Sequence, residues 1–160
     1  MPETASQDSA LWRNNHLGHW LRLALERFDS RVMALMAHHP GVPLGLANLA
    51  GRGQVGAAHI HITRHLAQSG SRLTDLAQAA GMSKQAMGTL VDQCEAWGMV
   101  TREADPLDAR ARKVQFTATG LAWLAAYQDA VAQAEDEMRA ATSPEVATVI
   151  AIGLEAYSGQ

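Results

Sequence analysis

The stretch over residues 71–118 constrains the fold most strongly, because its hydrophobic period changes partway along it. As far as Gly98, apolar residues recur at spacings of three and four, which predicts two helices. Thr74 is the expected N-cap of the first helix, and Gly81 suits its left-handed end. Ser83 is the expected N-cap of the second helix. Two short helices joined by a glycine-containing turn predict a helix-turn-helix.

Beyond the second helix the pattern changes to alternation. Residues 100–103 and 114–117 predict two short strands, and the Asp-Pro-Leu-Asp segment over 105–108 predicts the turn between them. A hairpin directly after a helix-turn-helix is the order of elements in a winged helix.

Helices are expected before this region as well. Apolar residues at spacings of three and four predict a long helix over about residues 9–38. Glycines break any regular pattern over 44–56, and a further helix is expected over about 55–67.

Two helices are expected after the hairpin. Thr117 or Thr119 caps the first, which continues to about residue 141, and Ser143 with Pro144 suits the start of the second. The first carries a stripe typical of a seam between packed helices, either in a second chain or within this one: Leu124, Tyr127, Val131, Ala134 and Met138. The apolar face of the closing helix comprises Val146, Val149, Ile150 and Leu154.

The predicted fold class is therefore mainly α with a small β wing, a winged helix-turn-helix flanked by long N- and C-terminal helices. We expect one structural domain with three regions: N-terminal helices over 1–70, the winged helix-turn-helix over 71–118, and C-terminal helices over 119–160.

Composition excludes several classes of protein. Cys94 is the single cysteine among 160 residues, so no intramolecular disulfide is possible, which suits a reducing cytoplasm. The N-terminal residues lack the pattern of a signal peptide, and no apolar run approaches the length that spans a bilayer. A glycine-rich phosphate loop, a Cys-x-x-Cys site and a recognisable carboxylate pair are also missing from the sequence. We expect a cytoplasmic protein that is not an enzyme, has no cofactor and does not bind membranes.

Residues 71–120 resemble the multiple-antibiotic-resistance repressor (MarR) family. The wing segment DPLDARARKVQFTATG resembles the family pattern of Asp-Pro-x-Asp, a pair of arginines, and a strand ending in Leu-Thr-x-x-Gly. The segment LTDLAQAAGMSKQAMGTLVDQCEAWGMVTR resembles the two helices and the exit strand. The chain departs from the family after the second Asp of the wing segment. The family usually has two arginines there, whereas this chain has Ala109 followed by Arg110.

The resemblance implies a transcriptional regulator that binds double-stranded DNA as a homodimer and usually acts as a repressor. It places the dimer interface on the N- and C-terminal helices. It also implies a small, frequently aromatic effector, bound between those helices and the DNA-binding lobe. A two-fold dimer with recognition helices about one DNA turn apart predicts a pseudo-palindromic operator.

The DNA-contacting residues are expected on the polar face of the second helix and on the wing. An α-helix fits the major groove, and its N-terminal residues reach base edges. Lys84 reaches guanine or a phosphate, and Gln85 suits adenine. The expected set is Ser83, Lys84, Gln85, Gly88 and Thr89 on the helix, with Arg110, Arg112 and Lys113 on the wing.

The charge of this region leaves a second function open. Basic and acidic residues are equally numerous over 71–120, and the whole chain has a formal net charge of −3. DNA binding must then depend on local positive charge, with a modest salt dependence. The alternative is a dimeric winged-helix module that binds a partner protein instead of DNA.

Several residues are candidates for sensing an effector or a metal, and each also has a simpler structural interpretation. Candidates for an effector pocket are Trp20, Phe28, His59 and His61, for which ordinary core packing is the alternative. His61 and His65 have the i, i+4 spacing of a metal pair, but solvated or helix-capping histidines are favoured and no metal is expected. Cys94 lies on the expected core face, where a thiol is usually inert.

Overall fold

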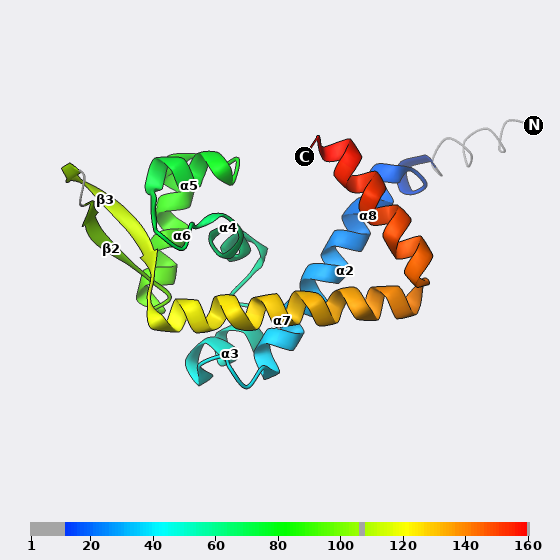
Figure 1. Cartoon of the computed structure of the whole chain (residues 1–160), viewed down its shortest axis with the longest axis horizontal. Coiled ribbons are helices and arrows are strands. Elements are labelled where there is room, and N and C mark those ends of the chain that lie inside the picture. The colour runs from blue at the N-terminus through cyan, green and yellow to red at the C-terminus, as the bar shows by residue number, and fades with distance from the viewer. Residues whose placement is uncertain (1–11, 106–107, 160) are drawn as a thin grey trace, which may run out of the picture. The chain divides into compact units, whose positions relative to one another are not determined.

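The computed structural model describes residues 12–105 and 108–159 and is mainly helical, with one small antiparallel sheet (Figure 1). The chain divides into two compact units, residues 1–31 and 32–160. Its elements are η1 (Trp12–Asn14), α2 (Leu17–His38), α3 (Leu44–Gly51), α4 (Ala57–His65), β1 (Ser71–Arg72), α5 (Leu73–Ala79), α6 (Lys84–Ala96), β2 (Val100–Asp105), β3 (Asp108–Phe116), α7 (Ala118–Ala141) and α8 (Pro144–Ser158).

The first long helix is shorter than predicted. A short 3-10 turn, η1, occupies Trp12–Asn14, and α2 begins only at Leu17. The Nδ1 atom of His16 accepts a hydrogen bond from the backbone N–H of His19 at 3.2 Å, so a histidine side chain satisfies one of the free donors at the start of the helix. Residues 9–11 of the predicted helix lie outside the described residues.

A helix, α3, occupies part of the stretch in which glycines were expected to break any regular pattern. The Pro43 carbonyl accepts hydrogen bonds from the N–H groups of Leu46 and Ala47, which opens the helix, and the side chains of Leu46 and Ala50 are buried. A glycine inside a helix costs about 1 kcal/mol relative to alanine, which packing of this kind offsets.

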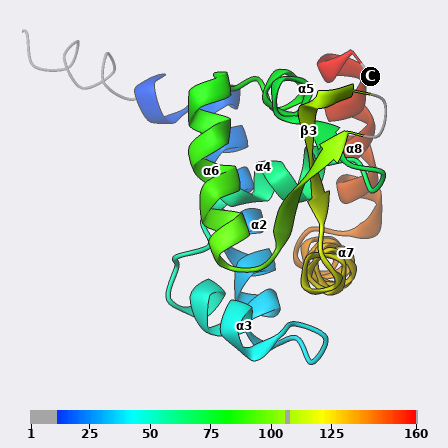
Figure 2. The same cartoon turned by 90° about the vertical axis from the view of Figure 1, so that its left-hand side faces the viewer.

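The helix-turn-helix consists of α5 and α6 (Figure 2). Gly81 has a φ of +63°, and Ser83 Oγ accepts a hydrogen bond from the N–H of Ala86 at 3.1 Å, so both predictions for the turn are confirmed. The prediction for Thr74 was wrong: α5 begins at Leu73, and Arg72 occupies the N-cap. The preceding strand holds Arg72 extended, which shifts the helix start upstream.

The wing is longer than predicted and is joined by a third strand. The sheet has the order β1-β3-β2, and all pairs are antiparallel. In the register of β2 and β3, Val100 pairs with Phe116 and Arg102 pairs with Val114. β1 contains only two residues, too few to show alternation, so sequence analysis missed it.

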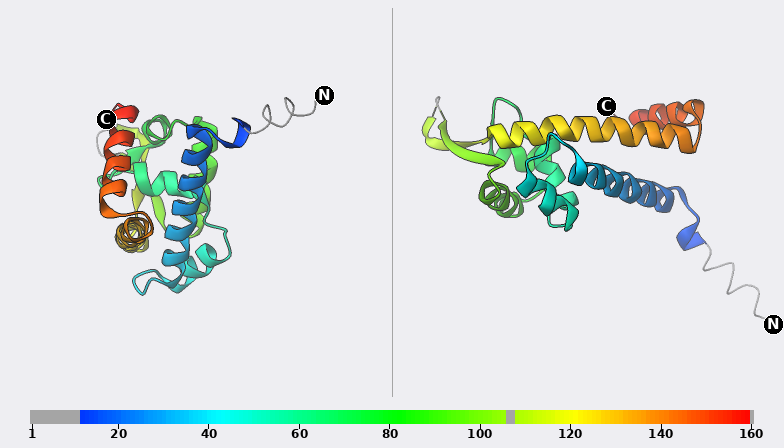
Figure 3. Two further views of the ribbon diagram at one scale, coloured as in Figure 1. Left: turned by 90° about the vertical axis from the view of Figure 1, so that its right-hand side faces the viewer. Right: turned by 90° about the horizontal axis from the view of Figure 1, so that it is seen from below.

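The C-terminal helices start as predicted. Thr117 Oγ1 accepts a hydrogen bond from the N–H of Gly120 at 3.0 Å, and Ser143 Oγ accepts one from the N–H of Val146 at 3.2 Å. Along α7 the buried side chains are Trp123, Ala126, Ala130 and Ala134, so only Ala134 of the predicted seam is buried. After a sharp turn, α8 follows α7 (Figure 3). None of the described side chains of α8 is buried.

The core of the larger unit joins the helix-turn-helix, the sheet and α7. Leu76, Met87, Val91 and Val114 are among its buried side chains. Trp123 is 1% exposed, and its indole N–H donates to Thr63 Oγ1 at 3.1 Å, which satisfies a polar group inside the core. No helix within the described ranges combines the length and apolar character that crossing a membrane requires.

Candidate nucleic-acid interface

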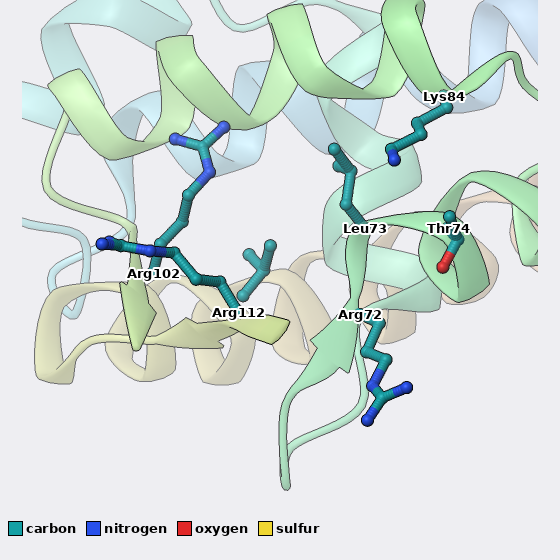
Figure 4. Close-up of a pocket in the computed structure, with 7 residues that line it drawn as sticks. Arg72, Leu73, Thr74, Lys84, Arg102 and Arg112 are labelled. Carbon is teal, nitrogen blue, oxygen red and sulfur yellow. The ribbon is translucent and has the colours of Figure 1, made fainter. Parts of the chain in front are cut away.

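A hollow of about 560 Å³ lies where the helix-turn-helix meets the sheet (Figure 4). Its lining comes from β1, α5, α6, β2 and β3, which are brought together by the pairing of β3 with both other strands. Four of the seven lining residues are basic. The lining comprises Arg72, Leu73, Thr74, Lys84, Arg102, Arg112 and Val114.

Two of these cations are neutralised by carboxylates. Arg72 donates to Asp105 Oδ2 from both Nε and Nη2, at 3.0 and 2.8 Å. Arg102 lies 2.5 Å from Asp92 Oδ1 through Nη2, and its Nη1 donates to Glu95. In Figure 4 the Arg102 side chain extends toward α6, the helix that carries both of its acidic partners. These pairs join β1 and α6 to the wing.

The other two cations have no such neutralisation. Lys84 and Arg112 are exposed, and among the described residues no carboxylate forms an ion pair with either. Lys84 is also the first residue of α6, where the helix dipole contributes additional positive potential. The hollow therefore has a net positive field despite the balanced charge of the whole region.

The exposed face of α6 carries the residues predicted to contact DNA. Ser83, Gln85 and Thr89 are exposed, and Gly88 is half-buried. The hydroxyl of Thr89 donates to the Gln85 carbonyl at 3.2 Å, whereas Ser83 Oγ acts as the helix cap. A Cβ at Gly88 would meet Leu73 at 3.8 Å, so this position faces the hollow.

The predicted wing residues divide between two faces of β3. Arg112 and Val114 both line the hollow, and Lys113 lies between them in the strand, on the opposite face. Arg110 lies nearer the tip in β3, and its side chain lies outside the described part of the structure. Of the eight predicted contacts, the structure brings Lys84 and Arg112 to one hollow.

The predicted effector residues are divided between the two compact units. Trp20 is exposed and Phe28 half-buried on α2, within the smaller unit. His59 and His61 lie on α4 in the larger unit, and both are half-buried. The ring of His59 contacts Trp97 with centroids 4.6 Å apart, and the ring of His61 stacks on His65 at 5.9 Å.

The other sensor candidates have environments close to those expected. Burial raises the pKa of the Cys94 thiol to about 12, as expected for an inert core thiol. Desolvation, then the charges of His61 and Arg64, lower the pKa of His65. Within the described residues, no three His, Cys, Asp or Glu side chains are grouped to hold a metal ion.

Sequence analysis missed most of the lining of the hollow. Arg72, Leu73 and Thr74 lie in or beside the two-residue β1, and Arg102 lies in the exit strand. No local pattern distinguishes them. Only the pairing of β3 with both β1 and β2 shows that these residues line one hollow with Lys84 of α6.

Comparison with known proteins finds the same fold elsewhere. Residues 55–111 match the MarR family. The fold is that of several solved regulators, so the resemblance to this family and the winged-helix fold predicted from the sequence are confirmed. None of the curated proteins matches the chain in a sequence comparison.

Three solved structures illustrate the similarity. The transcriptional repressor CouR, bound to a 23-mer DNA duplex, is 19% identical with a TM-score of 0.64, over 91% of this chain and 94% of that chain. BpsR of Bordetella bronchiseptica, whose DNA binding is regulated by 6-hydroxynicotinic acid, is 19% identical with a TM-score of 0.65, over 92% and 96%. A MarR family protein of Mycobacterium tuberculosis in complex with p-aminosalicylic acid is 23% identical with a TM-score of 0.61, over 89% and 98%. At these identities the matches show the fold.

Proposed function

From the match to the MarR family and the winged-helix fold, we propose that the chain is a homodimeric repressor that binds a pseudo-palindromic operator and responds to a small acid. The observation that carries the proposal is the positive hollow at the N-terminus of α6. It combines an exposed reading face with two unneutralised cations, Lys84 and Arg112, from the helix and the wing.

This geometry suits a phosphate backbone beside a major groove. Phosphate contacts position a protein on DNA, and side chains on the recognition helix specify the bases. Lys84 and Arg112 would bind phosphates, whereas Gln85 has the side chain that pairs with adenine. Arg110 and Lys113 would extend the wing contacts. Ser83 and Thr89 would bond phosphates, and Gly88 would let the backbone approach closely.

The exposed apolar surface of α8 supports a homodimer. Val149 is 69% exposed, Ile152 is 60% and Tyr157 is 86%, and no described side chain of this helix is buried. A folded monomer rarely leaves so much of a helix's apolar surface in water. A second copy of the chain would cover this surface and set two recognition helices on one operator.

An aromatic carboxylic acid is the effector class that we propose. Both small molecules bound or sensed by the solved relatives named above are aromatic acids. In the hollow, a carboxylate would meet Lys84 and Arg112, and an aromatic ring would meet Leu73 and Val114. An acid there would neutralise the charges that bind phosphate. The predicted pocket of Trp20, Phe28, His59 and His61 is the alternative location.

Titration of the purified protein against its own upstream intergenic DNA tests DNA binding. Random DNA serves as competitor, at two salt concentrations, and light scattering gives the mass of the complex. A competitor-resistant complex with one dimer per site is the expected result. Binding that is weak, equal for random DNA and lost at the higher salt would refute the proposal and favour the protein-interaction module.

Thermal-shift measurements with a panel of aromatic acids test the effector class. We expect stabilisation of the wild type, loss of that effect in Arg112→Ala, and no loss in Trp20→Ala. The opposite pattern would place the effector in the alternative pocket, and a flat response across the panel would reject aromatic acids as effectors.

A further inference from the structure

His59 on α4 makes a defined polar contact with the recognition helix. Its Nε2 atom lies 2.7 Å from Oε1 of Gln93 on α6, and its Nδ1 atom accepts the backbone N–H of Gly56 at 3.2 Å. A backbone N–H is always a donor, so Nδ1 carries no proton. In the neutral ring Nε2 therefore bears the hydrogen and donates to Gln93.

The same helix is anchored to α7 by two other side chains. Thr63 accepts the indole N–H of Trp123 at 3.1 Å inside the core, and Arg64 Nε donates to Tyr127 Oη at 3.1 Å. Helix α4 thus contacts α6 through its first turn and α7 through its last turn.

We propose that the His59–Gln93 hydrogen bond is a positioning contact that sets the orientation of the recognition helix relative to α7. The inference rests on the proposed DNA-binding function and adds to it a residue that touches no DNA. His59 acts through α6 and is a positioning residue.

The lever arm of α6 explains why one hydrogen bond matters. Gln93 lies nine residues after Lys84, about 13 Å along a helix that rises about 1.5 Å per residue. A tilt of about 10° around Gln93 would move the Lys84 end by about 2 Å, more than a base-edge hydrogen bond tolerates. The ring of Trp97, 4.6 Å from that of His59, packs at the same end of α6.

Two substitutions separate the two roles of the His59 ring. In His59→Asn, the side-chain oxygen keeps an acceptor near the Nδ1 position for Gly56, but the side chain is too short to reach Gln93. In His59→Gln, the longer amide places a donor near the Nε2 position and loses the cap. Both variants lose the aromatic contact with Trp97, so they differ only in which hydrogen bond is kept: the cap to Gly56 in His59→Asn and the contact with α6 in His59→Gln.

Operator affinity of these two variants is the decisive measurement. We expect His59→Asn to lose roughly three- to tenfold in operator affinity, the range that one hydrogen bond contributes, and His59→Gln to stay within about twofold of wild type. Affinity for random DNA, which depends on phosphate charge, should be the same in both variants. In a Gln93→Leu background, His59→Asn should cause no further loss.

Two further readouts distinguish positioning from general stability. Amide hydrogen exchange in α6 should be faster in His59→Asn than in His59→Gln, with equal exchange in α7. In wild-type protein, ¹⁵N NMR should show an unprotonated Nδ1 and a protonated Nε2 for His59. The opposite tautomer, or equal operator affinities for the two variants, would overturn the positioning role. Wild-type protein that does not distinguish operator from random DNA would instead refute the proposed function, and the role of this contact in DNA binding with it.

Discussion

The guanidinium of Arg72 donates two hydrogen bonds to a single buried oxygen of Asp105, which lies 33 positions further along the chain. The Asp105 side chain is 2% exposed, whereas that of Arg72 is 43% exposed. This pair fastens the two-residue strand before the helix-turn-helix to the outer end of β2. The start of the helix-turn-helix is thereby joined to the wing.

Removal of Arg72 should destabilise the contact between β1 and β2. Arg72→Ala leaves the buried Asp105 carboxylate without this cation, and a hydrogen bond to a charged group contributes about 1.5–3 kcal/mol. We expect the free energy of unfolding to fall by about 2 kcal/mol, measured by urea denaturation. Arg52→Ala, which removes an exposed arginine at the end of α3, is the matched control and should change stability by less than about 0.5 kcal/mol. Equal stabilities of the two variants would contradict this role.

Lys84 and Arg112 should account for much of the salt dependence of operator binding. Each neutralised phosphate contributes about 0.9 to the magnitude of the slope of log affinity against log salt concentration. A substitution removes one contact from each subunit of the dimer, so either alanine variant should reduce that magnitude by about 2. Arg52→Ala again serves as the control. Slopes that match wild type in both Lys84→Ala and Arg112→Ala would show that the hollow does not bind phosphate.

Gly88→Ala should improve stability and impair function. The new Cβ would meet nothing closer than Leu73 at 3.8 Å, and alanine favours a helix over glycine by about 1 kcal/mol. The methyl group would also stand on the face that we propose to approach DNA, so operator affinity should fall. Gly45→Ala in α3, where nothing lies within 4 Å, should leave affinity unchanged. An equal affinity for Gly88→Ala and wild type would show that backbone approach at this position is not used.

Gly120→Ala should be severely destabilising. A Cβ there would overlap the Met99 carbonyl oxygen and lie 2.9 Å from Phe116 Cδ1, so the start of α7 would have to leave the sheet. The expected loss is about 3 kcal/mol or more in the free energy of unfolding. Gly45→Ala is the control, and a Gly120→Ala protein as stable as that control would contradict the packing described for α7.

Cys94 should confer a loss of stability at alkaline pH. Burial raises the pKa of the folded thiol to about 12 from its ordinary value of 9.0, so above pH 9 the unfolded chain releases a proton that the folded chain keeps. Stability from this group is complete below pH 9 and is lost as the pH rises toward 12. Between pH 8 and pH 10 we expect a decrease of about 1 kcal/mol that is missing in Cys94→Ala. Identical dependence of unfolding free energy on pH in wild type and Cys94→Ala would contradict this role of the thiol.

The sequence by itself determined the features that depend on near neighbours. Ser83, Thr117 and Ser143 cap their helices as predicted, because each cap joins a side chain to an N–H three residues away. The hairpin and its family motif were also legible, because alternation and turn chemistry are local properties. The start of α2 and the existence of α3 were not, since a histidine cap and tertiary packing outweighed the local propensities.

Only the tertiary structure decided which polar and charged groups act together. Arg72 with Asp105 and His59 with Gln93 are each separated by more than 30 positions, and no sequence spacing relates them. Strand pairing and helix packing bring such groups within hydrogen-bond distance, and a cation is neutralised where this places a carboxylate beside it. Lys84 and Arg112 differ from Arg72 and Arg102 for this physical reason: the fold places carboxylates beside the second pair and none among the described residues beside the first.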